Sequence, residues 1–285
     1  PIGKLGVRIG SEYMSKYFGG YFDGNGKVIY NLYIDYSDST GVAYYVGLFG
    51  YMGRFDASVK NLTLKNGEVK GSRTDDSRTG ALVGCIDQKV FAPSVGKPIV
   101  IENCHNEGVT VLGDGNNSST GGIIGHSYGY AQSKDNIFPT SNSAISILNC
   151  TNSGDVTGIG SDSSVGGIIG HAYAEGKGTG DGRTCNGGHS CACTMVSNCT
   201  NRGDITATGA NSSTGGIIGY GYSSGDGIGY GSYGYGYGYG YIMISSCSNS
   251  GNVVGMGNGS LSFTGGIMGY GLAEGSTNNY GFPVT

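Results

Sequence analysis

The densest group of residues that could do chemistry is a short segment with three cysteines and one histidine. Cys185, His189, Cys191 and Cys193 fall within nine consecutive positions. Three thiolates and an imidazole make a ligand set for tetrahedral zinc. In an exported protein, however, loop cysteines more often pair with one another. We therefore favour a disulfide between two of Cys185, Cys191 and Cys193, with a zinc site or free thiols as the alternatives.

Two other sets of residues could carry chemistry. Asp75 and Asp76 are adjacent acids, and carboxylate pairs hydrolyse glycosidic bonds. No third acidic group converges on them in the sequence, so we favour a solvated loop. His126 and His171 hold equivalent repeat positions and could bind a metal, but we expect them to stack like the tyrosines at matching positions. The sequence thus predicts no enzyme, no catalytic residue, no bound metal and no cofactor, with a polysaccharide lyase or glycoside hydrolase as a minor alternative.

These residues are distributed over a repeating framework. A motif of two glycines and two apolar residues is clearest from Gly121, Gly166, Gly215 and Gly265, and weaker copies surround Gly47 and Gly80. A row of Cys104, Cys150, Cys199 and Cys247 recurs every 46 to 49 residues. Six copies of one motif predict a repeat architecture, in which stacked units share a core that none could form alone.

The repeating unit is a set of short strands broken by Gly, Asn and Ser, and good helix formers are scarce. We therefore expect an all-β fold, a parallel β-solenoid of about six to seven coils with long loops inserted at one corner. Residues 1–285 form one domain in this prediction. It contains an aromatic cap segment (1–45), lean coils (46–115) and coils with long insertions (116–285), the insertions lying at 127–144, 172–195 and 220–241.

Several segments resemble the GLUG-motif repeat proteins. They are Phe22–Leu32, Gly47–Gly50, Val59–Leu64 and the later copies of the double-glycine motif. The resemblance covers nearly the whole chain. It implies a right-handed parallel β-helix, an extracellular or cell-surface location, and a role in adhesion or surface architecture. The family has no shared catalytic residues to carry over.

Charge and hydropathy exclude two classes of partner. The net charge is −4 and only 13% of residues are charged, so no basic stripe is present to neutralise the phosphates of a nucleic acid. No apolar run approaches the ~20 residues of a membrane span. The chain opens on Pro1, and we expect any targeting segment to lie outside it.

The repeat positions also predict the interior. The cysteine row continues upstream as Leu62, which favours buried thiols over vertical disulfides. Asparagines next to this row should hydrogen-bond from coil to coil. The N-x-[Ser/Thr] pattern makes Asn61, Asn117, Asn211 and Asn258 candidate glycan acceptors. Asn149 and Asn198 also match the pattern, but we expect them to be engaged in the stack.

The last insertion alternates glycine and tyrosine. Its tyrosines are Tyr230, Tyr233, Tyr235, Tyr237, Tyr239 and Tyr241. The segment has low complexity, but an extended ribbon would place every tyrosine on one face and every glycine on the other. We expect the tyrosine face to be an interaction surface.

The double-glycine motif carries the functional hypothesis. Its two apolar residues are consecutive, as in Ile123 and Ile124, so in a strand one should point inward and the other outward. The outer members would form an exposed apolar stripe. We therefore expect a non-enzymatic structural protein that contacts copies of itself, as a homo-oligomer or head-to-tail filament. The alternative is a carbohydrate-binding surface adhesin.

Overall fold

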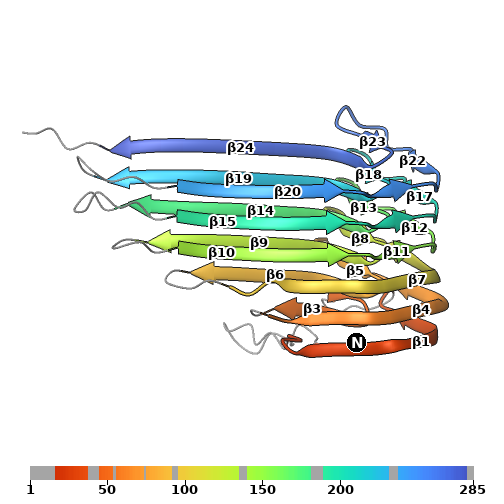
Figure 1. Ribbon diagram of the computed structural model, residues 1–285. Helices are drawn as coiled ribbons and strands as arrows, with labels where there is room; N and C mark the ends of the chain where they lie inside the picture. The colour runs from red at the N-terminus through yellow and green to blue at the C-terminus, as the bar shows by residue number, and fades with distance from the viewer. Residues whose placement is uncertain are drawn as a thin grey trace, which may run out of the picture.

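The computed structural model describes residues 17–37, 45–53, 56–73, 75–91, 96–134, 140–180, 189–230 and 237–280. The regular elements of these ranges are β-strands, and all the strand pairs are parallel (Figure 1). The strands build three sheets that run along one axis. The predicted all-β parallel solenoid is therefore confirmed. No helix that could span a bilayer occurs in the described part of the chain.

The first sheet contains the strands that begin each coil. In the first three coils these are β1 (Tyr21–Asp35), β4 (Ser58–Lys70) and β7 (Ile99–Gly113). Later coils divide the same path into β10 (Thr140–Leu148), β11 (Thr151–Asn152), β12 (Val156–Gly158), β15 (His189–Ser197), β16 (Thr200–Asn201), β17 (Ile205–Ala207), β20 (Tyr237–Ser245), β21 (Ser248–Asn249) and β22 (Val253–Gly255).

Each coil then passes through the other two sheets. The second sheet holds β2 (Tyr45–Val46), β5 (Arg78–Gly80), β8 (Ser119–Gly121), β13 (Ser164–Gly166), β18 (Ser213–Gly215) and β23 (Phe263–Gly265). The third holds β3 (Phe49–Gly53), β6 (Val83–Phe91), β9 (Ile124–Lys134), β14 (Ile169–Gly180), β19 (Ile218–Tyr230) and β24 (Met268–Tyr280). The described residues thus make six coils, within the predicted range.

The described parts of the three insertions lie at one corner, as predicted, but they form strands rather than loops. Each third-sheet strand runs outward and the next first-sheet strand runs back, so β9 faces β10, β14 faces β15 and β19 faces β20 (Figure 1). We call these facing strands the blade. Parallel pairing with neighbouring coils supplies backbone hydrogen bonds to each blade strand, and even the glycine-rich β20, at the edge of the first sheet, is held by β15 on one side.

The two layers of the blade pack through small residues. Ala131, Ala174 and Ala192 form a buried cluster between them. The backbones of the two layers approach each other most closely at the glycines of β20. A Cβ built on Gly240 would lie 2.3 Å from the carbonyl oxygen of Ser224. The predicted glycine face of the tyrosine ribbon therefore exists over the described part of β20, where it lets two backbones come together.

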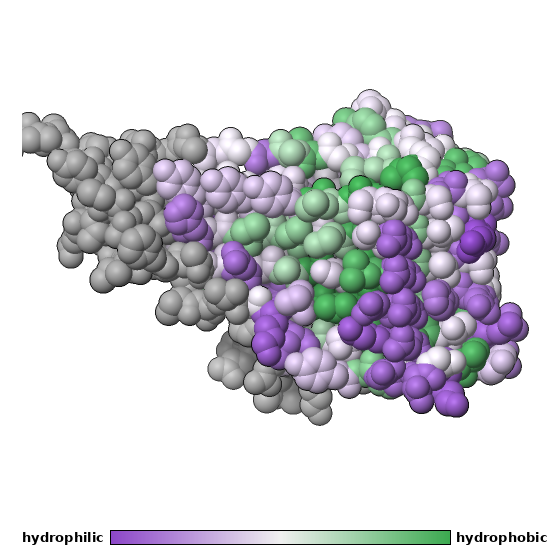
Figure 2. Space-filling model, in the orientation of Figure 1, coloured by the Kyte–Doolittle hydropathy of each residue, from purple (hydrophilic) through white to green (hydrophobic). Residues whose placement is uncertain are grey.

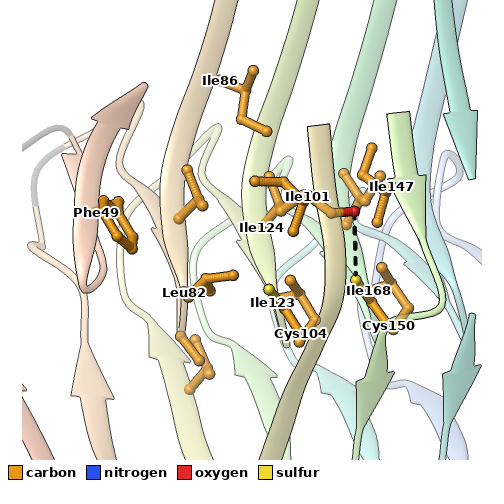
Figure 3. Packing of buried hydrophobic residues seen from close by; sticks show 14 of the residues in the cluster. Phe49, Leu82, Ile86, Ile101, Cys104, Ile123, Ile124, Ile147, Cys150 and Ile168 are labelled. Atoms are coloured by element: carbon orange, nitrogen blue, oxygen red, sulfur yellow. Dashed lines mark hydrogen bonds between the residues drawn. The ribbon is translucent and has the colours of Figure 1, made fainter. Parts of the chain in front are cut away.

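The solenoid core consists of identical positions stacked from coil to coil (Figure 3). Ile124, Ile169, Ile218 and Met268 pair in register, as predicted. The cysteine row is also stacked and consists of free thiols. Each thiol donates to backbone carbonyls, as Cys150 does to Ile101 at 3.8 Å. Burial raises the pKa of the Cys104 thiol to about 11.

The predicted apolar stripe on the outside does not exist. Ile123, Ile168 and Ile217 are as fully buried as Ile124, Ile169 and Ile218. The chain bends at the second glycine and the first isoleucine of the motif, between the second and third sheets. Alternation of inward and outward side chains applies to a straight strand, and this bend lets both isoleucines point into the core.

A buried asparagine ladder runs beside the cysteine row. Asn106 donates to Asn152 at 2.7 Å, Asn152 to Asn201 at 2.8 Å, and Asn201 to Asn249 at 2.7 Å. The same amides close the local turn, since Asn152 also donates to the carbonyl oxygen of Gly154 at 2.8 Å. The prediction of hydrogen-bonded asparagines is confirmed for this row. It was wrong for Asn149 and Asn198, which are exposed and hold left-handed corner conformations.

Candidate functional site

A groove runs along the solenoid where the second and third sheets meet. Outward-facing rings of the two sheets touch at both of its ends: Tyr45 lies 5.0 Å from Tyr51, and Phe263 lies 4.5 Å from Tyr270, between ring centroids. Between these contacts the groove has a volume of about 530 Å³. It is open to solvent and crosses the coils rather than following any one strand.

Successive coils contribute equivalent residues to the sides of the groove, and the fourth and fifth coils contribute to all three sides. The lip carries Asp76, Asn117, Asp162 and Asn211, all with positive φ, a conformation that Asn and Asp tolerate. The floor carries Ser119, Ser164 and Ser213, the first residues of β8, β13 and β18. The far wall carries His171, Tyr220 and Tyr270. Parallel strands lie ~4.8 Å apart, so these polar groups repeat with that spacing.

The wall is part of the predicted row Tyr51, Cys85, His126, His171, Tyr220 and Tyr270, whose in-register pairing is confirmed. The rings of His126 and His171 lie 4.8 Å apart but are tilted by 58°, so they do not stack flat. Burial, reinforced by the charge of Arg78, lowers the pKa of His171 to about 3. Burial also lowers the pKa of His126, and both rings are neutral at physiological pH.

One nitrogen of each histidine lacks a partner. His126 Nδ1 and His171 Nε2 are buried and meet no hydrogen-bonding group among the described residues. An unsatisfied buried polar atom costs about 1–3 kcal/mol. His171 lines the groove, so a ligand hydroxyl or a water molecule there could offset that cost.

The groove is polar at one end and apolar at the other. Asp76 and Arg78 line it in the second coil, and the Arg78 guanidinium donates to the Asp76 carbonyl oxygen. Leu261, Phe263 and Tyr270 line it in the last coil. Since the charged lining residues are two carboxylates and one guanidinium, the groove has no net attraction for a polyanion.

The three described members of the cysteine and histidine group predicted as a zinc or disulfide site do not converge on one point. His189, Cys191 and Cys193 alternate along β15 on one face, and residues two apart in a strand are too widely spaced to surround one ion. No three His, Cys, Asp or Glu residues in the described ranges are placed to hold a metal. Cys191 and Cys193 are free thiols. Cys185 lies outside the described residues, so a disulfide that includes it stays a prediction.

The tyrosine ribbon is described only in part. Tyr237, Tyr239 and Tyr241 project outward from β20 and are exposed, as predicted for one face of a ribbon. Tyr230 ends β19, and Tyr233 and Tyr235 lie outside the described residues.

The four glycan-acceptor candidates fall in different places. Asn61 occupies a corner of the first sheet and Asn258 is exposed in the last coil. Asn117 and Asn211 line the groove, so a glycan on either would occupy the space available to a ligand.

The groove was not predicted from the sequence. A signal for it was present in Ser119, Ser164 and Ser213, which stand two residues before a double glycine in three successive copies of the motif, but serines in that position are also typical of turns. The serine row forms the floor of a groove only because a second row, His171, Tyr220 and Tyr270 of the third sheet, lies beside it.

Comparison with known proteins adds little to this description. No protein-family model matches the chain, and no curated protein matches it, so the GLUG-repeat resemblance stays a prediction. Among solved structures, the chain is similar to the crystal structure of a candidate immunoglobulin A1 protease from Bacteroides ovatus. The TM-score is 0.45 and the identity 17%, over 90% of this chain and 68% of that one. A likeness of this strength supports no conclusion about activity.

Proposed function

We propose that this protein is an extracellular or cell-surface binding protein that holds a linear, uncharged glycan along the corner groove. The observation that carries the proposal is the repeated lining: a serine, an Asn or Asp, and an aromatic or imidazole ring come together in the fourth coil and again in the fifth, and parts of this set line the coils on either side. Hydroxyl, amide and carboxylate groups can hydrogen-bond the hydroxyls of successive sugar units. Tyrosine rings offer apolar faces with a polar tip.

Binding without turnover fits the chemistry of the wall. A general acid or base works best when its pKa lies near the working pH. The low pKa of His171 and the raised pKa of Tyr220, both due mainly to burial, keep these groups from exchanging protons near neutral pH. We therefore favour recognition over lyase or hydrolase activity, and the proposal needs no cofactor.

The test is a binding screen against immobilised neutral and acidic polysaccharides. We expect retention by a neutral linear glycan and no release of new chain ends. Ser164→Trp, which fills the middle of the floor, should abolish binding. Thr157→Trp, on the outside of the first sheet in the same coil, should not change it. Binding that survives Ser164→Trp, or cleavage of the glycan, would overturn the proposal.

The structural, filament-forming role expected from the sequence loses the surface on which it depended. That surface was an exposed apolar stripe, and its residues in the middle coils, Leu82, Ile123, Ile168 and Ile217, are buried. Self-association therefore needs a different surface.

A further inference from the structure

The two outer faces of the blade differ in charge. The face formed by β9, β14 and β19 carries Glu175, Lys177 and Asp226 among its tyrosines, and Lys177 pairs with Glu175. Mixed charges of this kind are typical of a solvated surface. The opposite face, formed by β10, β15 and β20, has no Lys, Arg, Asp or Glu among its described outward side chains.

The uncharged face carries large apolar side chains among smaller polar ones, and Asn142 and His189 are also exposed on it. Its largest side chains are Tyr237, Tyr239, Tyr241, Met195 and Met243, which are 42%, 44%, 46%, 36% and 52% exposed. Register places Cys191 beneath Tyr239 and Cys193 beneath Tyr241, and Ala144 beneath Cys193. Figure 2 shows hydrophobic side chains over the inner part of the blade, weakly hydrophilic ones toward its outer end, and a strongly polar band beside them. We call these outward side chains of β10, β15 and β20 the blade face.

The size of the blade face suits a weak protein contact. A large side chain contributes roughly 200 Å² when fully exposed, so the five named above leave on the order of 400 Å² uncovered. That lies within the range of the largest apolar patch on a typical monomer, about 300–600 Å², and such patches are often functional. It is about half of what each partner contributes to a standard interface.

We propose that the blade face is the contact between two copies of this chain, related by a two-fold axis. A flat sheet lacks the concavity of a small-molecule site, whereas two sheet faces pack directly against each other. In a two-fold contact each row meets the same kind of row. Because the blade face has no charged side chain, this arrangement brings no like charges together.

The contact is independent of the groove, since the blade face belongs to the first sheet and the groove to the other two. A dimer built in this way would leave both grooves open and present two sites for one polysaccharide, which strengthens attachment by raising the effective concentration of the second site.

Sedimentation equilibrium across a range of protein concentrations tests the proposal. We expect the average mass to rise toward that of a dimer at tens of micromolar, because the interface is small. Tyr239→Glu, which places a charge at the centre of the contact, should weaken the dimer at least about tenfold. Tyr239→Phe should retain it. Gln132→Glu, on the opposite blade face, is the matched control and should change dimerisation by less than about twofold.

Circular dichroism will show that each variant keeps its β-structure. A monomer at all concentrations would overturn the inference. So would a dimer that Tyr239→Glu leaves unchanged, or one that Gln132→Glu weakens equally.

Discussion

Replacing Asn152 with alanine should cost several times more stability than the same change at Asn249, in the last coil of this row of side chains. Asn152 is fully buried and makes four hydrogen bonds. It donates to Gly154 and Asn201, and it accepts from the Asn106 amide at 2.7 Å and from the Gly154 backbone N–H at 3.3 Å. Asn106 keeps other acceptors, at the carbonyl oxygens of Val109 and Gly122.

The expected magnitude follows from the groups left behind. Asn152→Ala strands the Gly154 N–H, the Gly154 carbonyl and the Asn201 side-chain oxygen in the interior. At about 1–2 kcal/mol for each unsatisfied group, the loss in unfolding free energy should be roughly 3–6 kcal/mol. Asn249, in the last coil, is only half-buried, donates to Gly251 at 3.0 Å and accepts from Asn201. We expect Asn249→Ala to cost about 1 kcal/mol, because water can reach the freed groups.

Urea unfolding followed by circular dichroism measures both values, and an unchanged urea dependence shows that the unfolded states are comparable. The reasoning is refuted if Asn152→Ala costs no more than Asn249→Ala. It is also refuted if the loss is below about 1 kcal/mol, since the ladder would then be no stronger than solvated amides.

Three further predictions concern the core, the blade and pH. Ile169→Asp should unfold the neighbouring coils because it buries an unpaired charge. The Ile267→Asp variant should still fold because this position is partly exposed, and near-equal melting temperatures of the two variants would contradict the prediction. Gly240→Ala should lower the unfolding free energy by about 1–3 kcal/mol or more, because the added Cβ overpacks the two blade layers. Gly266→Ala is the control, since its added Cβ would meet no atom within 4 Å, and thermal melts should show no change for it. The pKa of His171 is lowered to about 3 in the folded protein, whereas a histidine in the unfolded chain takes up a proton below about pH 6.5. The unfolded state therefore binds more protons between these two pH values. The unfolding free energy should be unaffected by this group above about pH 6.5 and should fall by up to about 1.4 kcal/mol per pH unit below it. His171→Tyr, which copies Tyr220 of the next coil, should reduce that slope in urea titrations between pH 4 and 7, and an unchanged slope would show that the histidine is protonated in the folded protein.

The amino-acid sequence by itself determined the stacking of the coils. Cys104, Cys150 and Cys199 recur at a nearly constant distance before each double glycine. A solenoid buries these residues only when identical positions lie above one another, so the periodicity alone predicts parallel pairing in register. The same repeat spacing predicts that the asparagines after the cysteines lie above one another. The alternation of tyrosine and glycine likewise predicts that Tyr239 and Tyr241 lie on one face of a strand.

Only the tertiary structure decided where the corners lie and what they do. Ile123 points inward because the chain bends beside it, and a rule based on straight strands assigns it to the outside. The glycine-rich insertions are strands because neighbouring coils and the facing layer hold their backbones, although their composition alone indicates disorder. The groove arises where rows from two sheets meet, and Ser164 and His171 become neighbours across a bend whose geometry depends on the packed coils around it.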